Sequence, residues 1–459
     1  MRSLQRNWAV SQKLFGTDGV RGLANNEPVT VESALKLAQA SVRVLAKEEN
    51  YPTVVVARDT RASGEMLESA IAAGLASNGV QVLLAGIIPT PAVAYLTTRY
   101  CASFGIMISA SHNPFQDNGI KFFGPNGYKL SDESERAIEA EYYYPGNHQL
   151  PTGKSIGRIR TIQEATEDYV TFAASTVAKD FSLSGVKIAV DLANGAAYQT
   201  TPMVLTMLGA EVDMHSSAPD GVNINVDCGS THPTTLSRIV RASGAAFGIA
   251  HDGDADRLLL CDELGFALDG DDLLAIAAAD LVLRDQLNKN TVVATIMSNF
   301  GLDEVMHRHG GKVFRTEVGD RFIVDALVQQ QLNLGGEQSG HMIFRDFTTT
   351  GDGLVAALQI IAIMLRTGKT LSELRQILKK FPQVLCNVAV KEKTPFEQFH
   401  LLTVRLREAE SRLNGKGRVL LRYSGTESKA RLLLEGLDTD ELHKLAEPIV
   451  AELVKNLGA

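Results

Sequence analysis

Phe104-Gly105-Ile106-Met107-Ile108 runs directly into Ser109-Ala110-Ser111-His112-Asn113-Pro114. The first five residues predict a short buried strand, because they are apolar or glycine throughout. The polar turn follows where that strand ends, which is where open α/β sheets bind their ligands. Ser111 is therefore a candidate nucleophile or phosphate acceptor. A serine that only caps a helix fits the same pattern, whereas a hydrolase elbow does not, because Gly-x-Ser-x-Gly is absent from this turn.

Further apolar runs of strand length alternate with amphipathic segments along most of the chain. Two such segments, residues 32–46 and 65–77, predict helices, and Ser131 is expected to cap another. The alternation predicts an α/β fold with mixed, mainly parallel sheets. The expected strands besides residues 104–108 are 53–57, 80–85, 187–190, 246–250, 258–260 and 292–296.

A chain of 459 residues is too long for one hydrophobic core, so several domains are expected. Breaks in the pattern place them at residues 1–155, 156–262, 263–375 and 376–459. The last part differs from the rest, with short strands at 384–390, 419–422 and 430–434 and a helix from Thr439 that we expect to bend or break near Pro448.

The composition is that of an ordinary globular protein, with 45% apolar and 21% charged residues and a net charge of −8. This charge argues against a general nucleic-acid or acidic-membrane surface, so an anionic substrate must be met by a few placed cations. Four scattered cysteines without a Cys-x-x-Cys pair indicate a reducing cytoplasm and neither a zinc site nor disulfides. The apolar stretch 354–365 is too short to span a bilayer. We expect a soluble cytoplasmic protein.

His251-Asp252-Gly253-Asp254-Ala255-Asp256-Arg257 is the most specific pattern in the chain. Three carboxylates at alternate positions between apolar strands repel one another unless a cation lies between them, and oxygen-only ligands suit a hard ion such as Mg²⁺. An EF-hand loop is the competing metal site, since Glu263 is twelfth from Asp252. It fails because Arg257 occupies the sixth position, where that loop needs glycine, and because strands flank the run.

Three more motifs carry polar groups next to glycine. Gly335-Gly336-Glu337-Gln338-Ser339-Gly340-His341 could bind sugar hydroxyls, or form a plain turn. Arg422-Tyr423-Ser424-Gly425-Thr426-Glu427, with Arg431, combines amides and guanidinium groups as a phosphate site does. Phe15-Gly16-Thr17-Asp18-Gly19-Val20-Arg21-Gly22 lacks a preceding strand, so it is no dinucleotide fingerprint. Arg21 in this glycine-rich loop is either a fixed cation facing the site or an ordinary exposed arginine. Lys121 could neutralise a phosphoryl group, or shuttle a proton if its pKa is lowered.

In combination and in order, these five motifs resemble those of the α-D-phosphohexomutase superfamily. The resemblance runs from Phe15 to about Gly436, nearly the whole chain. It implies three related α/β domains plus a C-terminal α+β domain around a central cleft. Tyr423 departs from the pattern, because many members have proline there, and this puts the detailed shape of the last loop in doubt.

The resemblance also implies a role for each matching residue. Ser111 matches the phosphoserine, and its oxygen joins Asp252, Asp254 and Asp256 as the Mg²⁺ ligands. The acid–base positions are matched by Lys121 and His341, the charge-neutralising positions by Arg21 and Arg257, and the sugar-hydroxyl contacts by Glu337 and Ser339. The site for the non-reacting phosphate is matched by Arg422, Ser424, Gly425, Thr426 and Arg431.

The implied activity is an intramolecular phosphoryl transfer on a hexose monophosphate, with one Mg²⁺ per chain and a hexose 1,6-bisphosphate as intermediate and activator. Gln338 and the residues that fill three motifs (15–22, 108–114 and 335–341) are most similar to the branch that acts on glucosamine phosphates. The alternative is a member that acts on glucose or mannose phosphates. The partners expected are small sugar phosphates, with neither nucleic acid nor membrane, and the chain is compatible with a homodimer. A phosphatase or a silent sugar-phosphate sensor ranks well below a mutase.

Overall fold

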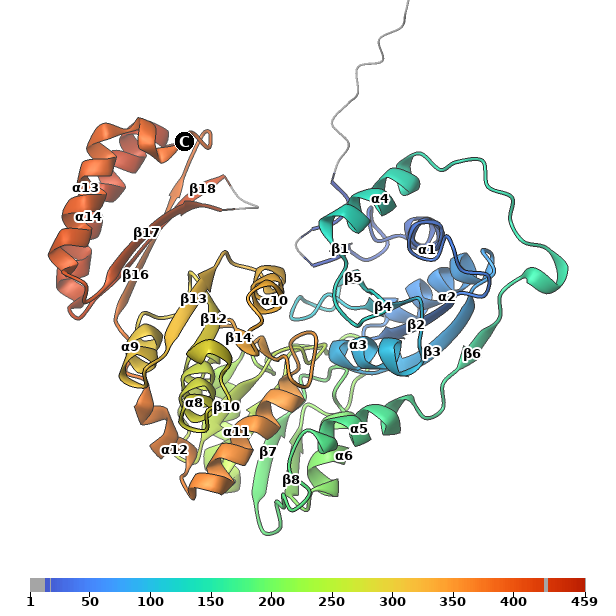
Figure 1. Ribbon diagram of the computed structural model, residues 1–459, viewed down its shortest axis with the longest axis horizontal. Helices are drawn as coiled ribbons and strands as arrows, with labels where there is room; N and C mark the ends of the chain where they lie inside the picture. The colour runs from blue at the N-terminus through green and yellow to red at the C-terminus, as the bar shows by residue number, and fades with distance from the viewer. Residues whose placement is uncertain (1–12, 17, 425–427, 459) are drawn as a thin grey trace, which may run out of the picture. The chain divides into compact units, whose positions relative to one another are not determined.

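The computed structural model describes residues 13–16, 18–424 and 428–458 and separates into two compact units (Figure 1). Unit 1 comprises Met1–Met297 and Val313–Arg375, and unit 2 comprises Ser298–Lys312 and Gln376–Ala459. Three of the four sheets lie in unit 1 and the fourth lies in unit 2.

The first sheet has six strands in the order β1-β5-β4-β2-β3-β6. Strands β2, β3, β4 and β6 are parallel, whereas β5 runs antiparallel to both β4 and β1. Helix α1 packs against α2 and α4, and α3 packs against β4 and β2. The elements are β1 (Val20–Leu23), α1 (Val31–Leu45), β2 (Thr53–Arg58), α2 (Ser63–Ala76), β3 (Gln81–Ile87), α3 (Thr90–Arg99), β4 (Phe104–Ile108), β5 (Asp117–Phe123), α4 (Asp132–Tyr143), η1 (Gly153–Ser155) and β6 (Ile159–Thr161).

The second sheet has the order β11-β10-β9-β7-β8. Strands β7, β8 and β9 are parallel, and β10 turns back antiparallel to β9. Helix α7 packs on β7, β9 and β10. The elements are α5 (Ala165–Ser175), β7 (Lys187–Asp191), α6 (Thr200–Met207), β8 (Glu211–His215), α7 (Pro233–Ser243), β9 (Phe247–Ala250), β10 (Leu259–Asp262) and β11 (Ala267–Leu268).

The third sheet has the order β13-β12-β14-β15, with α10 packed on β12 and β14 and with α8 and α11 packed on each other. In the described residues no single helix is long and apolar enough to cross a membrane. Gly353–Thr367 and Leu371–Ile377 meet that requirement only as a pair, which is bent by 93°. The elements are α8 (Gly270–Leu283), η2 (Asn288–Asn290), β12 (Thr291–Thr295), β13 (Lys312–Thr316), α10 (Asp320–Gln329), β14 (Leu334–Gly336), β15 (Met342–Phe344), α11 (Gly353–Thr367), α12 (Leu371–Leu374) and η3 (Arg375–Ile377).

Unit 2 contains an antiparallel sheet of order β16-β18-β17. Helix α14 packs on β16 and β18, and α13 packs on β17 and α14 (Figure 1). The predicted break near Pro448 is wrong, because α14 continues through that residue. The elements are α9 (Gly301–Arg308), β16 (Gln383–Ala389), η4 (Phe396–Gln398), α13 (His400–Leu413), β17 (Arg418–Tyr423), β18 (Lys429–Glu435) and α14 (Thr439–Leu457).

The predicted fold class is confirmed: three sheets of mixed, mainly parallel strands alternate with helices, and an α+β part follows. Ser131 caps α4, its side chain accepting a hydrogen bond from the Ser134 N–H group. Arg21, in contrast, does not lie in a loop. It is part of β1, where it pairs with Gly119 of β5.

Candidate active site

Ser111 lies in the turn after β4, the strand between β2 and β5 whose five residues are all buried. Its φ angle is +53°, in the left-handed region that non-glycine residues rarely adopt. The hydroxyl donates a 2.5 Å hydrogen bond to Asp252 Oδ2. Asp252 lies in the loop between β9 and β10 of the second sheet. The structure therefore brings the first and second predicted motifs into direct contact.

The acidic motif forms the connection between the antiparallel neighbours β9 and β10. Asp252, Asp254 and Asp256 are buried, and each offers a carboxylate oxygen within 4.8 Å of the other two. Asp254 Oδ1 and Asp256 Oδ1 are buried without a hydrogen-bond partner within the described part of the chain. Three buried carboxylates, two of them with an oxygen that accepts no hydrogen bond from the described residues, fit a hard divalent cation, so this triad can bind a metal ion.

The electrostatics of the triad follow from this burial. Burial raises the pKa of Asp252 to about 7, with the neighbouring Asp256 and Asp254 carboxylates acting in the same direction. Burial also acts to raise the pKa of Asp256, but Lys121 and a hydrogen bond with His341 outweigh it and lower that pKa. A bound cation would favour the ionised form of all three carboxylates.

Lys121 lies on β5, almost fully buried, with Nζ 2.7 Å from Asp254 Oδ2 and 3.7 Å from Asp256 Oδ2. Burial acts to lower the pKa of Lys121, but Asp18 and the triad outweigh it and raise that pKa. The condition for a proton shuttle, a lowered pKa of Lys121, is therefore not met. Lys121 is a cation that offsets the charge of the triad.

Two arginines lie around these acids. Arg257 Nε is 4.0 Å from Asp252 Oδ2 and 3.9 Å from Asp256 Oδ1. Arg21 forms an ion pair with Asp18, and its Nε donates to the Asp18 carbonyl oxygen at 3.3 Å. Both side chains remain partly exposed, at 22% and 27%, so they can reach a bound anion.

His341 is buried and joins the third sheet to the triad. Its Nδ1 is 3.6 Å from Asp256 Oδ2, and its Nε2 accepts the Gly351 N–H group at 3.2 Å. Burial acts to lower the pKa of His341, but Asp256 and Asp320 outweigh it and raise that pKa. The hydrogen bond from Gly351, in contrast, favours the neutral ring.

Glu337 and Ser339 follow β14, on the same loop as His341. Glu337 Oε1 accepts the Gly319 N–H group at 3.1 Å, and its Oε2 accepts the exposed Ser339 hydroxyl at 3.4 Å. The loop is attached to the loop of the acidic triad, because the Leu258 N–H group donates to the Gly340 carbonyl at 3.0 Å. The predicted sugar-binding residues are thus fixed beside the triad's own loop.

Three of the predicted phosphate-site residues, Arg422, Ser424 and Arg431, are described and lie in unit 2. Arg422 and Arg431 are cross-strand partners in the β17–β18 pair, so their side chains share one face of the sheet. Ser424 is buried and its N–H group donates to the Lys429 carbonyl at 2.9 Å. Gly425 and Thr426 lie outside the described residues. Tyr423 stacks on Phe396 with ring centroids 4.2 Å apart.

A series of paired acidic and basic side chains, which the sequence did not predict, lies beside the triad. Asp18 contacts Lys121 at 2.9 Å and also pairs with Lys129, which in turn pairs with Asp320. Asp320 Oδ2 is 3.9 Å from His341 Nε2. Asp18 belongs to a motif that was recognised, but Lys129 and Asp320 stand in no local pattern that could have revealed them.

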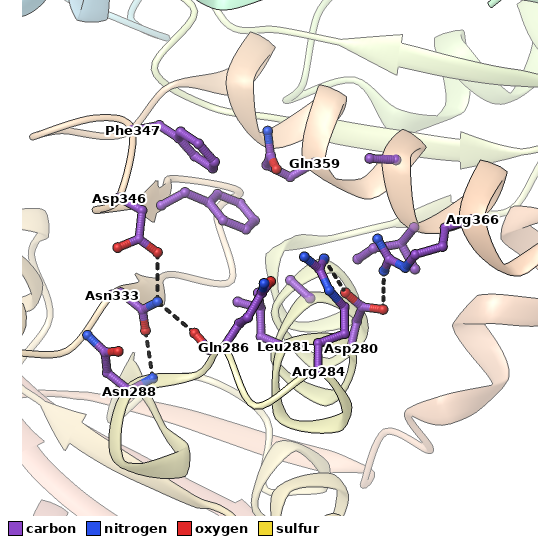
Figure 2. A pocket seen from close by; sticks show the side chains of 14 residues that line it. Asp280, Leu281, Arg284, Gln286, Asn288, Asn333, Asp346, Phe347, Gln359 and Arg366 are labelled. Carbon is purple, nitrogen blue, oxygen red and sulfur yellow. Dashed lines mark hydrogen bonds and ion pairs between the residues drawn. The ribbon is translucent and has the colours of Figure 1, made fainter. Parts of the chain in front are cut away.

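A cavity of about 440 Å³ lies elsewhere in unit 1, between α8, α11 and the loops beside them (Figure 2). Its polar groups bind one another: Arg284 and Arg366 both pair with Asp280, and Asn333 donates to Asp346 at 2.7 Å. Asn333 precedes β14 whereas Glu337 follows it, so this cavity and the sugar loop lie at opposite ends of one strand. The predicted catalytic residues lie at the triad and are absent from the lining of this cavity.

Family comparisons agree with this geometry. Models of the phosphoglucomutase/phosphomannomutase family match α/β/α domain I at residues 12–145, domain II at 167–265, domain III at 269–381 and the C-terminal domain at 385–452. The chain therefore belongs to this family of enzymes, and the predicted superfamily is confirmed.

Particular members are similar over nearly the full length. A protein of Geobacter sp. (strain M21) named phosphoglucosamine mutase is 48% identical over 448 residues, which cover 97% of this chain and 99% of that protein. A family member of known structure from Burkholderia thailandensis has a TM-score of 0.80 and 23% identity, covering 98% of this chain and all of that one. An N-acetylphosphoglucosamine mutase of Aspergillus fumigatus, solved with GlcNAc-6P and magnesium, has a TM-score of 0.66 and 18% identity over 96% and 95% of the two chains.

Proposed function

We propose that this chain is a phosphoglucosamine mutase, which interconverts glucosamine 6-phosphate and glucosamine 1-phosphate through a phosphoserine at Ser111. The observation that carries the proposal is the contact between Ser111 Oγ and Asp252 Oδ2, at 2.5 Å, inside the buried acidic triad. The 48% identity with relatives of that name supports the glucosamine sugar. The product would supply amino-sugar nucleotide and cell-wall precursor synthesis.

The residues of this chain divide the work of the reaction among them. Asp252, Asp254 and Asp256 would hold Mg²⁺, which when bound supplies positive charge beside the transferring phosphoryl group. The bond from phosphorus to Ser111 Oγ breaks while a bond from phosphorus to a sugar hydroxyl oxygen forms. Ser111 Oγ leaves with the electron pair and takes up a proton, and the hydroxyl proton passes to a base.

Lys121 and His341 are the candidates for these proton transfers. Lys121 enters the step protonated because its pKa is raised, which favours charge neutralisation and makes it a weaker acid than a group whose pKa lies near the working pH. His341 is subject to opposing influences on its proton and suits the role of base. Arg21 and Arg257 would neutralise the phosphoryl oxygens, since such transfer depends mainly on positioning and charge.

The bisphosphate must turn around before the second transfer, so one site has to hold the phosphate that is not reacting. Arg422, Ser424, Gly425, Thr426 and Arg431 are proposed for that role, and Glu337 and Ser339 for binding the sugar hydroxyls. Arg422→Ala is then expected to raise KM for the sugar phosphate at least tenfold. The four domain bounds, a homodimer and a cytoplasmic location remain expectations from the sequence.

The test is a mutase assay with Mg²⁺, primed with glucose 1,6-bisphosphate and followed by ³¹P NMR. Glucosamine, glucose and mannose phosphates are compared in wild type, Ser111→Ala and the control Ser69→Ala, which changes an exposed serine of α2. Fast interconversion of the glucosamine phosphates that only Ser111→Ala abolishes supports the proposal. Preference for glucose or mannose phosphates would contradict the substrate, and free phosphate as sole product would contradict the mutase itself.

A further inference from the structure

Asp59 and Arg61 lie directly after β2, and neither has a part in the mechanism above. Strand β2 runs parallel to β4, so the residues that follow it lie beside the turn that carries Ser111. Both side chains are fully buried, and Arg61 Nε donates to Asp59 Oδ2 at 2.9 Å. A buried ion pair in this place needs an explanation, because taking two charges out of water is costly.

The Arg61 guanidinium makes no contact that a substrate could share. It has five N–H donors in a fixed planar fork, and one of them is used on Asp59. The other four point at carbonyl oxygens of the Ser111 turn and of the start of β5. Those carbonyls belong to Ser111 at 2.8 Å, Asn113 at 2.9 Å, Asp117 at 3.1 Å and Pro114.

Asp59 restrains the amide side of the same turn through Ser109. Its Oδ2 accepts the Ser109 hydroxyl at 2.6 Å, and Ser109 Oγ in turn accepts the Ser111 N–H group at 2.9 Å. Asp59 Oδ1 accepts the Arg61 N–H group at 3.0 Å, which fixes the pair internally. The backbone amide and the carbonyl of Ser111 are therefore both held by one ion pair.

Such restraint matters because of the conformation of Ser111. With φ at +53° the residue is in a sparsely populated region, which persists only where the surroundings hold it. Asn225, from the second sheet's domain, supports the same group by donating to the Ser111 carbonyl at 2.9 Å. In this conformation Ser111 Oγ points at Asp252.

We propose that Asp59 and Arg61 are positioning residues that hold the Ser111 backbone so that its oxygen faces the acidic triad. The inference rests on the proposed function, since it assigns the pair to the phosphoserine step. Direct binding of the phosphoryl group by Arg61 is the other possible role. It is disfavoured because all five donors are used within the protein and the side chain has no exposed surface.

The decisive variant is Arg61→Lys, which keeps the charge but replaces the planar fork with a single nitrogen that cannot reach four carbonyls. Misplacing a reacting group by about 1 Å can cost roughly 100-fold in rate, so we expect kcat to fall on the order of 100-fold. KM for glucosamine 6-phosphate should change less than about threefold, because the sugar-binding residues remain in place. The matched control is Arg58→Lys in the last residue of β2; the Arg58 side chain pairs with Glu65 and Glu68, so this variant should leave kcat unchanged.

A second variant keeps the test decisive if Arg61→Lys does not fold. Ser109→Ala removes only the hydroxyl between Asp59 and the Ser111 N–H group, and it should lower kcat about tenfold at unchanged KM. The inference is overturned if either folded variant keeps the wild-type kcat, or if the loss appears in KM instead. Failure of the proposed function is a separate result, because it shows as wild-type protein that does not interconvert the glucosamine phosphates at all.

Discussion

Gly253 stands between Asp252 and Asp254. Because it has no side chain, the loop of the acidic triad can approach the Ser111 turn closely. A Cβ atom at this position would lie 2.5 Å from the Ser111 carbonyl oxygen and 2.8 Å from Asn225 Nδ2. Both distances are shorter than van der Waals contact, so a methyl group would force the loops apart. The glycine is therefore needed for close approach of backbone to backbone.

Gly253→Ala is expected to lower kcat at least tenfold, because the Ser111 turn must move away from the triad. Steady-state kinetics of the variant measure this directly. The control is Gly244→Ala in the same domain, where an added Cβ meets nothing within 4 Å although φ is +66°. It should cost about 1 kcal/mol of stability from the strained backbone and leave kcat unchanged. Equal kcat values for Gly253→Ala and wild type would contradict the close approach described above.

At the residue scale, the sequence predicted the groups that stand in a local pattern. Asp252, Asp254 and Asp256 alternate within five residues, and such alternation between apolar strands has few explanations other than a cation. Asn225 and Arg61 escaped notice because each acts on a turn distant in the sequence, where only the folded chain brings them. The sequence also could not predict that the pKa of Lys121 is raised, because this shift depends on which carboxylates surround the amine in the folded chain.

At the scale of elements, buried strands were the most predictable features. Strand β4 has the predicted bounds, Phe104–Ile108, because a run of five apolar or glycine residues flanked by polar ones has the length of a buried strand and is too short for a typical helix. Helix α14 shows the opposite case. Pro448 removes one amide, but Leu445, Ile449 and Leu453 pack into the core of unit 2 and hold the helix together.

Helix α11 begins at a buried carboxylate whose ionisation the protein opposes. Asp352 caps the helix by accepting the Val355 N–H group at 2.9 Å, and both its oxygens accept the Tyr169 hydroxyl. Burial nevertheless raises the pKa of Asp352 from 3.8 to about 6. Because the folded pKa lies above the unfolded value, the folded state binds the proton more tightly and loses stability as pH rises from 3.8 through about 6.

Asp352→Asn should therefore become more stable relative to wild type as the pH is raised. The rise in pKa corresponds to roughly 3 kcal/mol, gained by the variant between about pH 4 and pH 7. Thermal melts across this range measure the difference. Asp438→Asn is the control, because Asp438 caps α14 in an exposed position. A stability difference between Asp352→Asn and wild type that does not vary with pH would show that Asp352 is not desolvated as described.

At the scale of the whole molecule, the division into units was only partly readable from the sequence. The sequence predicts a last domain at residues 376–459, yet residues 298–312 also belong to unit 2. They are attached by tertiary contacts, such as the Asn299 side chain, which bonds to both the N–H and the carbonyl of Phe381. The local sequence pattern does not indicate that residues 298–312 pack with unit 2 while the residues on both sides of them belong to unit 1.

Mg²⁺ should stabilise the folded protein, because it relieves the repulsion among three buried carboxylates. Binding to the folded state alone contributes about 2.7 kcal/mol at a concentration 100 times Kd. We expect a chelator to lower Tm and abolish mutase activity, and added Mg²⁺ to restore both. NaCl at equal ionic strength is the control for screening. An unchanged Tm on chelation, with activity retained, would contradict a metal site at the triad.

The most direct test of the central claim is to follow one phosphoryl group. The protein is incubated with glucose 1,6-bisphosphate carrying ³²P on both phosphates, freed of ligand, and then mixed with unlabelled glucosamine 6-phosphate in a single turnover. We predict that Ser111 carries the label, shown by peptide mapping and by its loss in Ser111→Ala. The label should then pass to glucosamine 1,6-bisphosphate. Label that never attaches to Ser111, or that leaves it only as inorganic phosphate, would contradict the account.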